Sequence, residues 1–556
     1  MKEQIAGDEF FPEDVTANTA TGFYCVGPHR DLFPDQADIN RVETLTDYTD
    51  TVGSVFLGLT VGCARCHDHK FDPIPQKDYY RLQAVFAPLV KTKVALNRLS
   101  SLGWDVDENI REIRLREIGE EIGALQKRCR AKLYDDKMAR LSAEVRAAIR
   151  ASDNNKTPRQ RELASEYAAA VRVSDDEVRA CFTADEAAQM RRVEKSLAAM
   201  FANYRAKPFA CGATDAGDFA PKTFVPARGL RAAEPVEPGF LSALGGGGID
   251  ERSFERKATG PIPLFPTTGR RHALGAWLTR PDHPLTARVF VNRVWQYHFG
   301  RGLVHTASDY GRRGASPSHP ELLNWLAAEF VSQGWSVKKL HREILLSAAY
   351  RRAAGTTKES KDRDPENVYL ARFTRRRLQA EELRDAILAV TGNLNLKMGG
   401  KPVVPPLGKE ELFGLIGPPD KAWIVTYDRG EYTRRSIYMM QKRTFRMPML
   451  EAFDAPEPML TCPRRDASTT APQSLTLLNG SFLREHAQAL ADQLAQTSNP
   501  VDEAWRKILG RAPAPEENRD AAALLSAQEK NLGSRPKAIA ELVRALLNTN
   551  EFLYVD

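Results

Sequence analysis

The chain has 556 residues and a mass of 62.0 kDa, with 42% hydrophobic and 27% charged residues. This composition excludes a fibrous, collagen-like or wholly disordered protein, and the length is sufficient for several hydrophobic cores. A formal net charge of +7 is too dilute over this length to indicate binding to nucleic acid or to an anionic membrane. We therefore expect no nucleic-acid partner.

Segments for membrane insertion or export are not visible. The longest apolar run, residues 52–62, is well below the roughly 20 residues of a membrane-spanning helix, so we expect no membrane span. Residues 1–9 lack the apolar core and the small-residue cleavage site of a secretory signal. Seven cysteines are too few for a disulfide scaffold, and an odd number cannot all pair within the chain.

Residues 1–95 form the first predicted domain. An apolar stretch over residues 52–61 leads into the sequence Cys63-Ala64-Arg65-Cys66-His67. Residues 78–86 follow with apolar side chains at helical spacing, and a proline soon after ends that predicted helix. The cysteine motif is therefore expected between two helices.

Three further regions complete a mainly α, multi-domain fold. Residues 96–205 have apolar side chains at helical spacing among many charged ones, which predicts a helical arm. Residues 206–266 are rich in Gly and Pro with short β-like pieces, as in a linker or a small β module. Residues 267–556 form a helical C-terminal domain. Its predicted helices cover residues 284–299, 336–350, 379–391, 471–483 and 500–552.

One more helix of this domain is predicted from its start signal. Ser318-His319-Pro320-Glu321 has the spacing of a capping box, with proline in the first helical turn. The helix is expected to continue to Gln333, because Gly334 is a common terminator.

The motif that carries chemistry is Cys63-x-x-Cys66-His67. Two thiols at this spacing can each reach one vinyl group of a porphyrin, and the adjacent imidazole can reach the iron from the same turn. The pattern is the signature of covalent haem attachment. The sequence thus predicts haem c as cofactor, bound through Cys63 and Cys66, with His67 as the proximal iron ligand.

Other interpretations of the motif stay open. It could supply half of a zinc site, although no second cluster with zinc-ribbon spacing is present, or a redox dithiol, which would favour a βαβ context. It could also be a purely structural motif. His69 is two residues beyond the ligand and is expected to be structural. For the opposite face of the haem, His29, a distant methionine and an open position are alternatives.

Two parts of the chain resemble known domains. Residues 58–74 with residues 77–80 resemble the planctomycete-type cytochrome c-like domain, and the second half resembles its usual companion, a domain of unknown function. The matching stretches of the second half are residues 283–288, 291–295, 298–304, 318–323, 451–456 and 462–465. In typical members more of the first domain precedes a segment like residues 3–9, so the resemblance implies that an N-terminal part is missing here.

The resemblance also implies a setting. It implies an exported, periplasmic, haem-linked protein of bacteria that degrade complex polysaccharides, with a redox partner protein and a carbohydrate as candidate partners. A resemblance in fold supplies no reaction mechanism.

Five polar residues of the second domain are candidates for a catalytic site. Arg288 and Asn292 share one helical face, and His298 follows near the helix end. Together with Asp309 and His319 they could transfer a proton from a sugar hydroxyl while a haem accepts electrons. In the structural alternative, His319 belongs to a helix cap, Arg288 to an ion pair and His298 to the core.

Adjacent arginines recur at residues 351–352, 375–377, 434–435 and 464–465. They fit the oxyanions of acidic or sulfated sugars, or they serve as ion-pair partners. The sequence therefore favours a c-type haem protein in periplasmic electron transfer or haem-linked oxidation, whether or not it is an enzyme. The alternative is a non-catalytic binding or scaffold module whose motif is structural or metal-binding.

Overall fold

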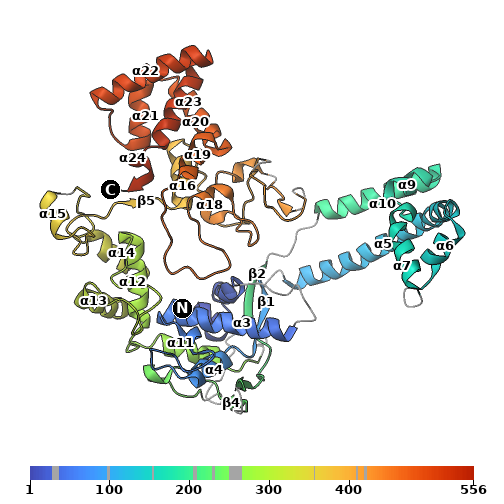
Figure 1. The fold of residues 1–556 in the computed structure, drawn as a ribbon, viewed down its shortest axis with the longest axis horizontal. Helices are drawn as coiled ribbons and strands as arrows, with labels where there is room; N and C mark the ends of the chain where they lie inside the picture. Colours follow the sequence, from blue (N-terminus) through green and yellow to red (C-terminus); the bar gives the residue numbers. More distant parts are fainter. Residues whose placement is uncertain are drawn as a thin grey trace. The chain divides into compact units, whose positions relative to one another are not determined.

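The computed structural model describes residues 1–27, 37–96, 101–152, 156–203, 209–227, 232–249, 266–355, 357–408, 411–418, 422–426 and 428–555. Helices dominate these residues and the strands are short, so the expected mainly α fold is confirmed. The chain divides into two compact units, of which the first joins Met1–Thr92 to Cys211–Asp556 and the second is Lys93–Ala210 (Figure 1). Across the described segments, no helix has both the length and the apolarity to cross a bilayer.

The first core of unit 1 is built from helices that are distant in sequence. Ile5, Tyr79 and Leu274 are each fully buried in it, although they come from three different helices. Burial of such side chains is the main favourable term in folding, so these segments stabilise one another. The helices around this core are α1 (Lys2–Phe10), α2 (Val15–Ala20), α3 (Ala37–Val52), α4 (Gln76–Ala84) and α11 (Arg270–Leu278).

Short strands flank the same core. β1 (Leu89–Ala95) pairs with β2 (Phe209–Asp215), and β3 (Thr223–Val225) pairs antiparallel with β4 (Glu234–Val236). Beyond β4, Phe240 stacks on Trp277 of α11 with ring centroids 4.8 Å apart. The described part of the Gly/Pro-rich region is therefore packed against the core.

A buried ion cluster ties three of these elements together. The guanidinium of Arg271, on α11, is fully buried and lies 2.8 Å from Asp8 and 3.2 Å from Glu9, both on α1. Its Nε lies 2.9 Å from Asp215 at the end of β2. Buried charges are tolerated only when they are paired, so this cluster fixes the N-terminal helix against α11.

A second core lies between three helices in the middle of the chain. Phe290 of one helix stacks on Phe330 of the next at 5.1 Å. The helices are α12 (Thr286–Phe299), α13 (Pro320–Ser332) and α14 (Val337–Leu346). The expected start of α14 is confirmed, because the Ser336 hydroxyl accepts the amide of Lys339. The helix ends four residues earlier than expected.

The predicted capping box at the start of α13 is wrong. The N-cap residue is His319, and it makes no capping hydrogen bond through its side chain. Ser318 is instead engaged elsewhere, since its amide donates to the Leu303 carbonyl and its hydroxyl contacts His319 Nδ1 at 3.0 Å. The expected proline in the first turn, Pro320, is present.

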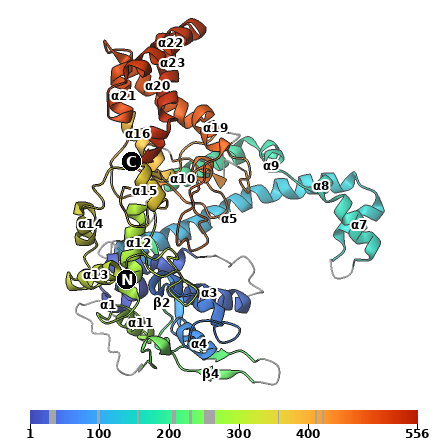
Figure 2. The ribbon, with the colours of Figure 1, turned by 60° about the vertical axis from the view of Figure 1, so that its left-hand side comes forward.

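The C-terminal core is a bundle of helices in which α20, α22 and α23 pack side by side (Figure 2). The predicted helix over residues 471–483 is interrupted, because Gly480 takes an extended conformation between two helices. The elements here are α15 (Lys358–Arg363), β5 (Arg376–Arg377), α16 (Ala380–Val390), α18 (Pro448–Ala452), α19 (Ala471–Asn479), α20 (Ser481–Leu494), α21 (Pro500–Leu509), α22 (Pro515–Leu532), α23 (Arg535–Leu547), α24 (Asn550–Leu553) and β6 (Tyr554–Val555), and β5 pairs with β6.

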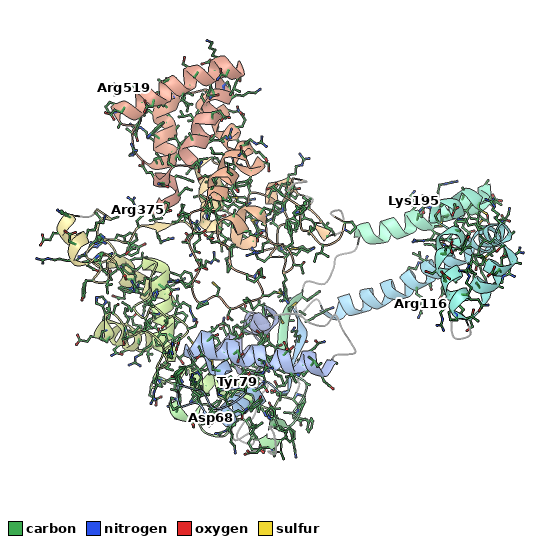
Figure 3. The ribbon with its side chains drawn as sticks, in the orientation of Figure 1. Asp68, Tyr79, Arg116, Lys195, Arg375 and Arg519 are labelled. Carbon is green, nitrogen blue, oxygen red and sulfur yellow. The ribbon has the colours of Figure 1, made fainter. Side chains whose placement is uncertain are left out.

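The described residues of unit 2 are mainly helical, apart from the strand residues at its two ends. The long helix α5 (Ser101–Ala139) runs beside α10 (Ala184–Asn203) (Figure 1). Four shorter helices connect the two in the sequence. Arg116 lies on the first of these two helices and Lys195 on the second (Figure 3). The shorter helices are α6 (Ala143–Arg150), α7 (Pro158–Glu166), α8 (Ala168–Val171) and α9 (Asp175–Cys181).

Candidate functional site

The cysteine motif lies between α3 and α4. After α3 a π-helical turn at Gly53–Leu57 ends at Gly58, which has a left-handed backbone with φ of +60°. A side chain at Gly58 would also collide with Tyr310, since its Cβ would come within 2.7 Å of that ring. Glycine therefore lets the chain reverse here and enter a short 3-10 helix, Val61–Ala64, that carries the first cysteine.

Both cysteines of the motif are exposed. Cys63 and Cys66 lie on one turn at the surface, and none of the chain's seven cysteines, all in described segments, forms a disulfide. Covalent haem attachment requires accessible thiols, and both thiols of the motif are accessible.

His67 is exposed, and one of its two ring nitrogens forms a hydrogen bond with the backbone. Its Nδ1 lies 2.6 Å from the carbonyl oxygen of Asp68, so this nitrogen donates its proton to the backbone. A neutral imidazole held in this way has its lone pair on Nε2. Iron- and zinc-binding histidines are commonly fixed by such a bond to a backbone carbonyl.

His69 has a different environment, although it is only two residues away. Its side chain is 4% exposed, and its Nδ1 accepts the amides of Asp72 at 2.8 Å and Phe71 at 3.3 Å. Its Nε2 contacts the hydroxyl of Thr60 at 3.1 Å. Both ring nitrogens are therefore used to hold the loop, in keeping with a structural role.

The loop after the motif is tied down at several points. The carboxylate of Asp68, labelled in Figure 3, accepts the amide of Gln76 at 2.8 Å. The carbonyl of Arg65 accepts from the Gln76 amide group at 2.9 Å and from the Tyr80 hydroxyl at 3.0 Å. These bonds fix the backbone between the second cysteine and α4, so the thiols and the imidazole are held in a defined arrangement.

A hollow of about 460 Å³ adjoins Cys63. This volume is in the range of cofactor and small-ligand sites. The hollow is polar and acidic on one side, where α3 faces it, and more apolar where residues 59–61 and 459–461 line it. Its lining residues are Glu43, Thr44, Thr46, Asp47, Asp50, Thr51, Ser54, Leu59, Thr60, Val61, Gly62, Cys63, Met459, Leu460 and Thr461.

The acidic side of the hollow is partly shielded from water. Burial raises the pKa of Asp50 to about 6, although the Tyr79 hydroxyl and the Arg65 guanidinium act in the opposite direction. Burial also raises the pKa of Asp47. A side chain at Gly62 would collide with Asp50, since its Cβ would lie 2.8 Å from that carboxylate. The glycine before Cys63 thus allows the carboxylate to approach the motif.

The motif has the residues that haem attachment requires. Only part of the neighbouring hollow has the apolar lining that suits a haem. The two thiols are accessible and His67 keeps Nε2 as a ligand atom. Cys63 lines the hollow together with Met459, a methionine 396 positions along the chain that could serve as the distant ligand. The acidic wall is unlike the apolar surroundings common around haem. His29 lies outside the described residues.

Arg288 and Asn292 have structural partners within the second domain. Arg288 donates to the Asn324 side chain at 2.8 Å and to the carbonyl of Pro284, 2.6 Å away, and it forms no ion pair within the described residues. Asn292 is fully buried, and its amide group bonds both the carbonyl and the amide of Val304, at 3.0 and 2.8 Å. The two share a helix, as expected, but their side chains bond different partners.

The other three candidates are similarly engaged with their own neighbours. His298 Nε2 contacts His341 Nδ1 at 2.7 Å, and burial lowers the pKa of His298. Asp309 accepts the amide of Gly311 in a turn, at 3.0 Å. His319 contacts Ser318 at the start of α13. Among the described residues no side-chain hydrogen bond joins any two of the five candidates, and each helps to pack its own segment.

The acidic residues of the hollow were not predicted from the sequence. Glu43, Asp47 and Asp50 are spaced by four and three residues, which places them on one face of α3. That spacing is the signal that could have identified them. Residues 459–461 carry no comparable signal, because only the folded chain brings them to this hollow.

Two further pairs of cysteines are brought together by the fold. Burial and the neighbouring thiol of Cys181 raise the pKa of Cys129 to about 11. Burial, followed by the charge of Cys211, raises the pKa of Cys25. These four thiols are separate from the motif, so they serve as controls for experiments on Cys63 and Cys66.

Two family models match separate segments of unit 1. Residues 1–91 match the model PSCyt2, protein of unknown function (DUF1549), and residues 270–525 match PSD1, protein of unknown function (DUF1553). Both models describe domains of unknown function. They are planctomycete-type companion domains, so this part of the resemblance is confirmed, and neither match is to a cytochrome c domain. No curated protein and no solved structure matches the chain.

Proposed function

We propose that the chain is a c-type haem-binding protein of the periplasm that acts in electron transfer or in haem-linked oxidation. The observation that carries the proposal is the arrangement of the motif: Cys63 and Cys66 are both exposed and unbridged, and His67 has its Nδ1 bound to a backbone carbonyl. In this arrangement two thiols and one imidazole nitrogen face solvent from a single fixed turn. A haem bound there would supply one-electron redox chemistry.

In this proposal the residues of the motif and its loop have defined roles. Cys63 and Cys66 would hold the haem through thioether bonds, and His67 would offer Nε2 to the iron. The carbonyl of Asp68 holds the Nδ1 proton and thereby sets the tautomer of the ring. The loop bonds of Gln76 and Tyr80 to the Arg65 carbonyl keep these groups in register.

The rival interpretation is a binding or scaffold module in which the motif is structural or holds a metal such as zinc. Zinc would need two further protein ligands near the cysteines. Within the described residues no group of three or more His, Cys, Asp or Glu side chains is arranged to hold a metal ion. This favours haem over zinc at the motif.

The decisive experiment is to produce the full chain in a host with a cytochrome c maturation system. We expect a Soret band that survives acid–acetone extraction, because thioether bonds are covalent, and we expect Cys63→Ser to remove it. Cys211→Ser, which also changes an exposed cysteine, should retain the band. A colourless wild-type protein with stoichiometric zinc would contradict the proposal and support the metal-binding alternative.

The same protein distinguishes an enzyme from an electron relay. Reduction of the bound haem by one member of a panel of sugars would indicate carbohydrate oxidation. If every sugar leaves the oxidised spectrum unchanged while a redox partner protein reduces it, the chain acts as a relay. The periplasmic location, which follows from the resemblance, is tested by fractionation of cells that express the natural gene.

A further inference from the structure

A second hollow, of about 330 Å³, lies in the C-terminal half of unit 1, apart from the cysteine motif. It is formed where the end of α12, β5 and β6 meet the loop that follows α18, and it is here called the arginine pocket. Its lining residues are Gln296, Tyr297, Phe299, Gly300, Arg301, Thr374, Arg375, Arg376, Arg377, Leu378, Gln379, Phe453, Asp454, Arg464, Arg465, Asp466, Ala467, Ser468, Thr469 and Tyr554.

The pocket gathers arginines from three separate segments of the chain. Six arginines line it, whereas only two acidic residues, Asp454 and Asp466, do so. Two of the adjacent-arginine motifs of the sequence, residues 375–377 and 464–465, thus meet in one place. The other two do not contribute, because residues 351–352 are exposed elsewhere and Arg434 is buried against Glu431.

Ion pairs hold several of these arginines in position. Arg376 pairs with Glu382 at 2.9 Å, and Arg465 pairs with Glu381 at 2.5 Å, both on α16. Arg301 pairs with Glu366 at 2.8 Å. Arg464 makes no ion pair within the described residues and is exposed at the rim. The pocket therefore combines fixed guanidinium groups with one whose charge is available to a ligand.

Two residues that line the pocket each have a buried polar atom without a hydrogen-bond partner among the described residues. One is Nε of Arg377, whose side chain is only 6% exposed and whose other nitrogens bond Asp454, Phe453 and Ser468. The other is Oε1 of Gln296, a residue that is 6% exposed and donates from Nε2 to the Pro463 carbonyl at 3.0 Å.

A buried polar atom without a hydrogen-bond partner is energetically unfavourable, so two of them around one pocket indicate a missing partner. The Arg377 atom is a donor and requires an acceptor, whereas the Gln296 atom is an acceptor and requires a donor. A hydroxyl group beside an anionic oxygen satisfies both, and the charge of Arg464 favours the anion.

We propose that the arginine pocket binds a small hydroxyl-bearing oxyanion, namely a sugar carrying a carboxylate, sulfate or phosphate group. The oxyanion accepts hydrogen bonds from the guanidinium of Arg464 and from Nε of Arg377. A sugar hydroxyl donates to Oε1 of Gln296. This proposal does not depend on haem, since none of these residues belongs to the cysteine motif.

The test is calorimetric titration of the full chain with D-glucuronate, glucose 6-phosphate, inorganic sulfate and glucose at low ionic strength. We expect at least one of the two anionic sugars to bind at least tenfold more tightly than either glucose or sulfate, because neither of those offers both groups. Arg464→Gln should weaken binding of that sugar about tenfold, which corresponds to the loss of one charge-assisted hydrogen bond.

Arg519→Gln is the matched control for Arg464→Gln. Arg519 is an exposed arginine on α22 and is not among the residues that line the pocket (Figure 3). Both variants should unfold at the wild-type temperature, since both side chains are exposed. Gln296→Leu should reduce the preference for the anionic sugar over sulfate. Equal affinity for sulfate and sugar, or binding that Arg464→Gln leaves unchanged, would overturn the proposal.

Discussion

Two histidines of the motif loop illustrate how residue-scale contacts separate a ligand from a structural side chain. His67 is exposed and uses one ring nitrogen, whereas His69 is nearly buried and uses both. A metal ligand must keep an atom free to bind, while a loop-holding residue has none to spare. The pair therefore offers matched variants whose effects should be opposite.

We expect His69→Ala to lower the free energy of unfolding by about 1–3 kcal/mol, because the part-buried amide of Asp72 and the more exposed amide of Phe71 would lose their acceptor. His67→Ala removes an exposed ring and should change stability by less than about 0.5 kcal/mol. In haem-loaded protein the His67 variant should instead lose the spectrum of a histidine-ligated iron. Urea unfolding and absorption spectra check both; equal destabilisation by the two variants would contradict the assignment.

The sequence predicted the motif but not the hollow beside it, for a physical reason. Two cysteines and a histidine within five residues form a local pattern, and local geometry follows from spacing alone. The hollow depends on α3 and on Met459, which lie far apart in the sequence. The five candidates of the second domain shared a plausible chemistry, yet their bonds go to separate neighbours.

At the scale of elements, the buried Arg271 cluster connects α1, β2 and α11. One guanidinium contacts three carboxylates, from Asp8, Glu9 and Asp215. The segments of the two family matches are therefore held together by charge as well as by a shared apolar core. Sequence periodicity identifies each helix but gives no indication of such a connection.

Arg271→Met should destabilise unit 1 by about 3–5 kcal/mol, because three buried carboxylates would lose their only guanidinium partner within the cluster. Arg280→Met, at a surface pair with Asp282, should leave stability almost unchanged. Chemical denaturation followed by circular dichroism measures both. A loss below about 1 kcal/mol in the Arg271 variant would show that the cluster contributes little to anchoring α1.

The starts of helices could be predicted from the sequence where they depend on residues next to the helix in the chain. Ser336 caps α14 and Gln379 begins α16, as the sequence indicated. The start of α13 was not predictable in detail, because the backbone of Ser318 bonds Leu303, a residue outside the helix. Tertiary bonds of this kind override a local capping pattern.

At the scale of the whole molecule, both proposed sites depend on segments that are far apart in the chain. The hollow near Cys63 needs residues 43–63 and 459–461, and the arginine pocket needs residues 296–301, 374–379, 453–469 and 554. Both proposed functions therefore require unit 1 to be folded. Its stability should depend on pH, because several of its buried groups have shifted pKa values.

Burial, helped by the charges of Asp215 and Asp8, raises the pKa of Glu9 to about 7 from the ordinary 4.5. Between these values the unfolded chain releases a proton that the folded chain retains, so this group stabilises the fold most below pH 4.5 and loses its contribution as the pH rises through 7. Burial lowers the pKa of His283 to about 4, so that group acts in the opposite direction, and its contribution is lost as the pH falls from 6.5 to 4.

Glu9→Gln removes the first of these two groups and leaves the second in place. Relative to wild type, the variant should gain stability as the pH rises from about 5 to about 7.5, by at most about 1.4 kcal/mol per pH unit, because glutamine binds no proton in either state. Glu3→Gln changes an exposed glutamate of the same helix and should follow the wild-type curve. Urea unfolding at half-unit pH steps measures all three proteins. If the difference between Glu9→Gln and wild type is constant over this range, the carboxyl of Glu9 does not retain its proton in the folded protein.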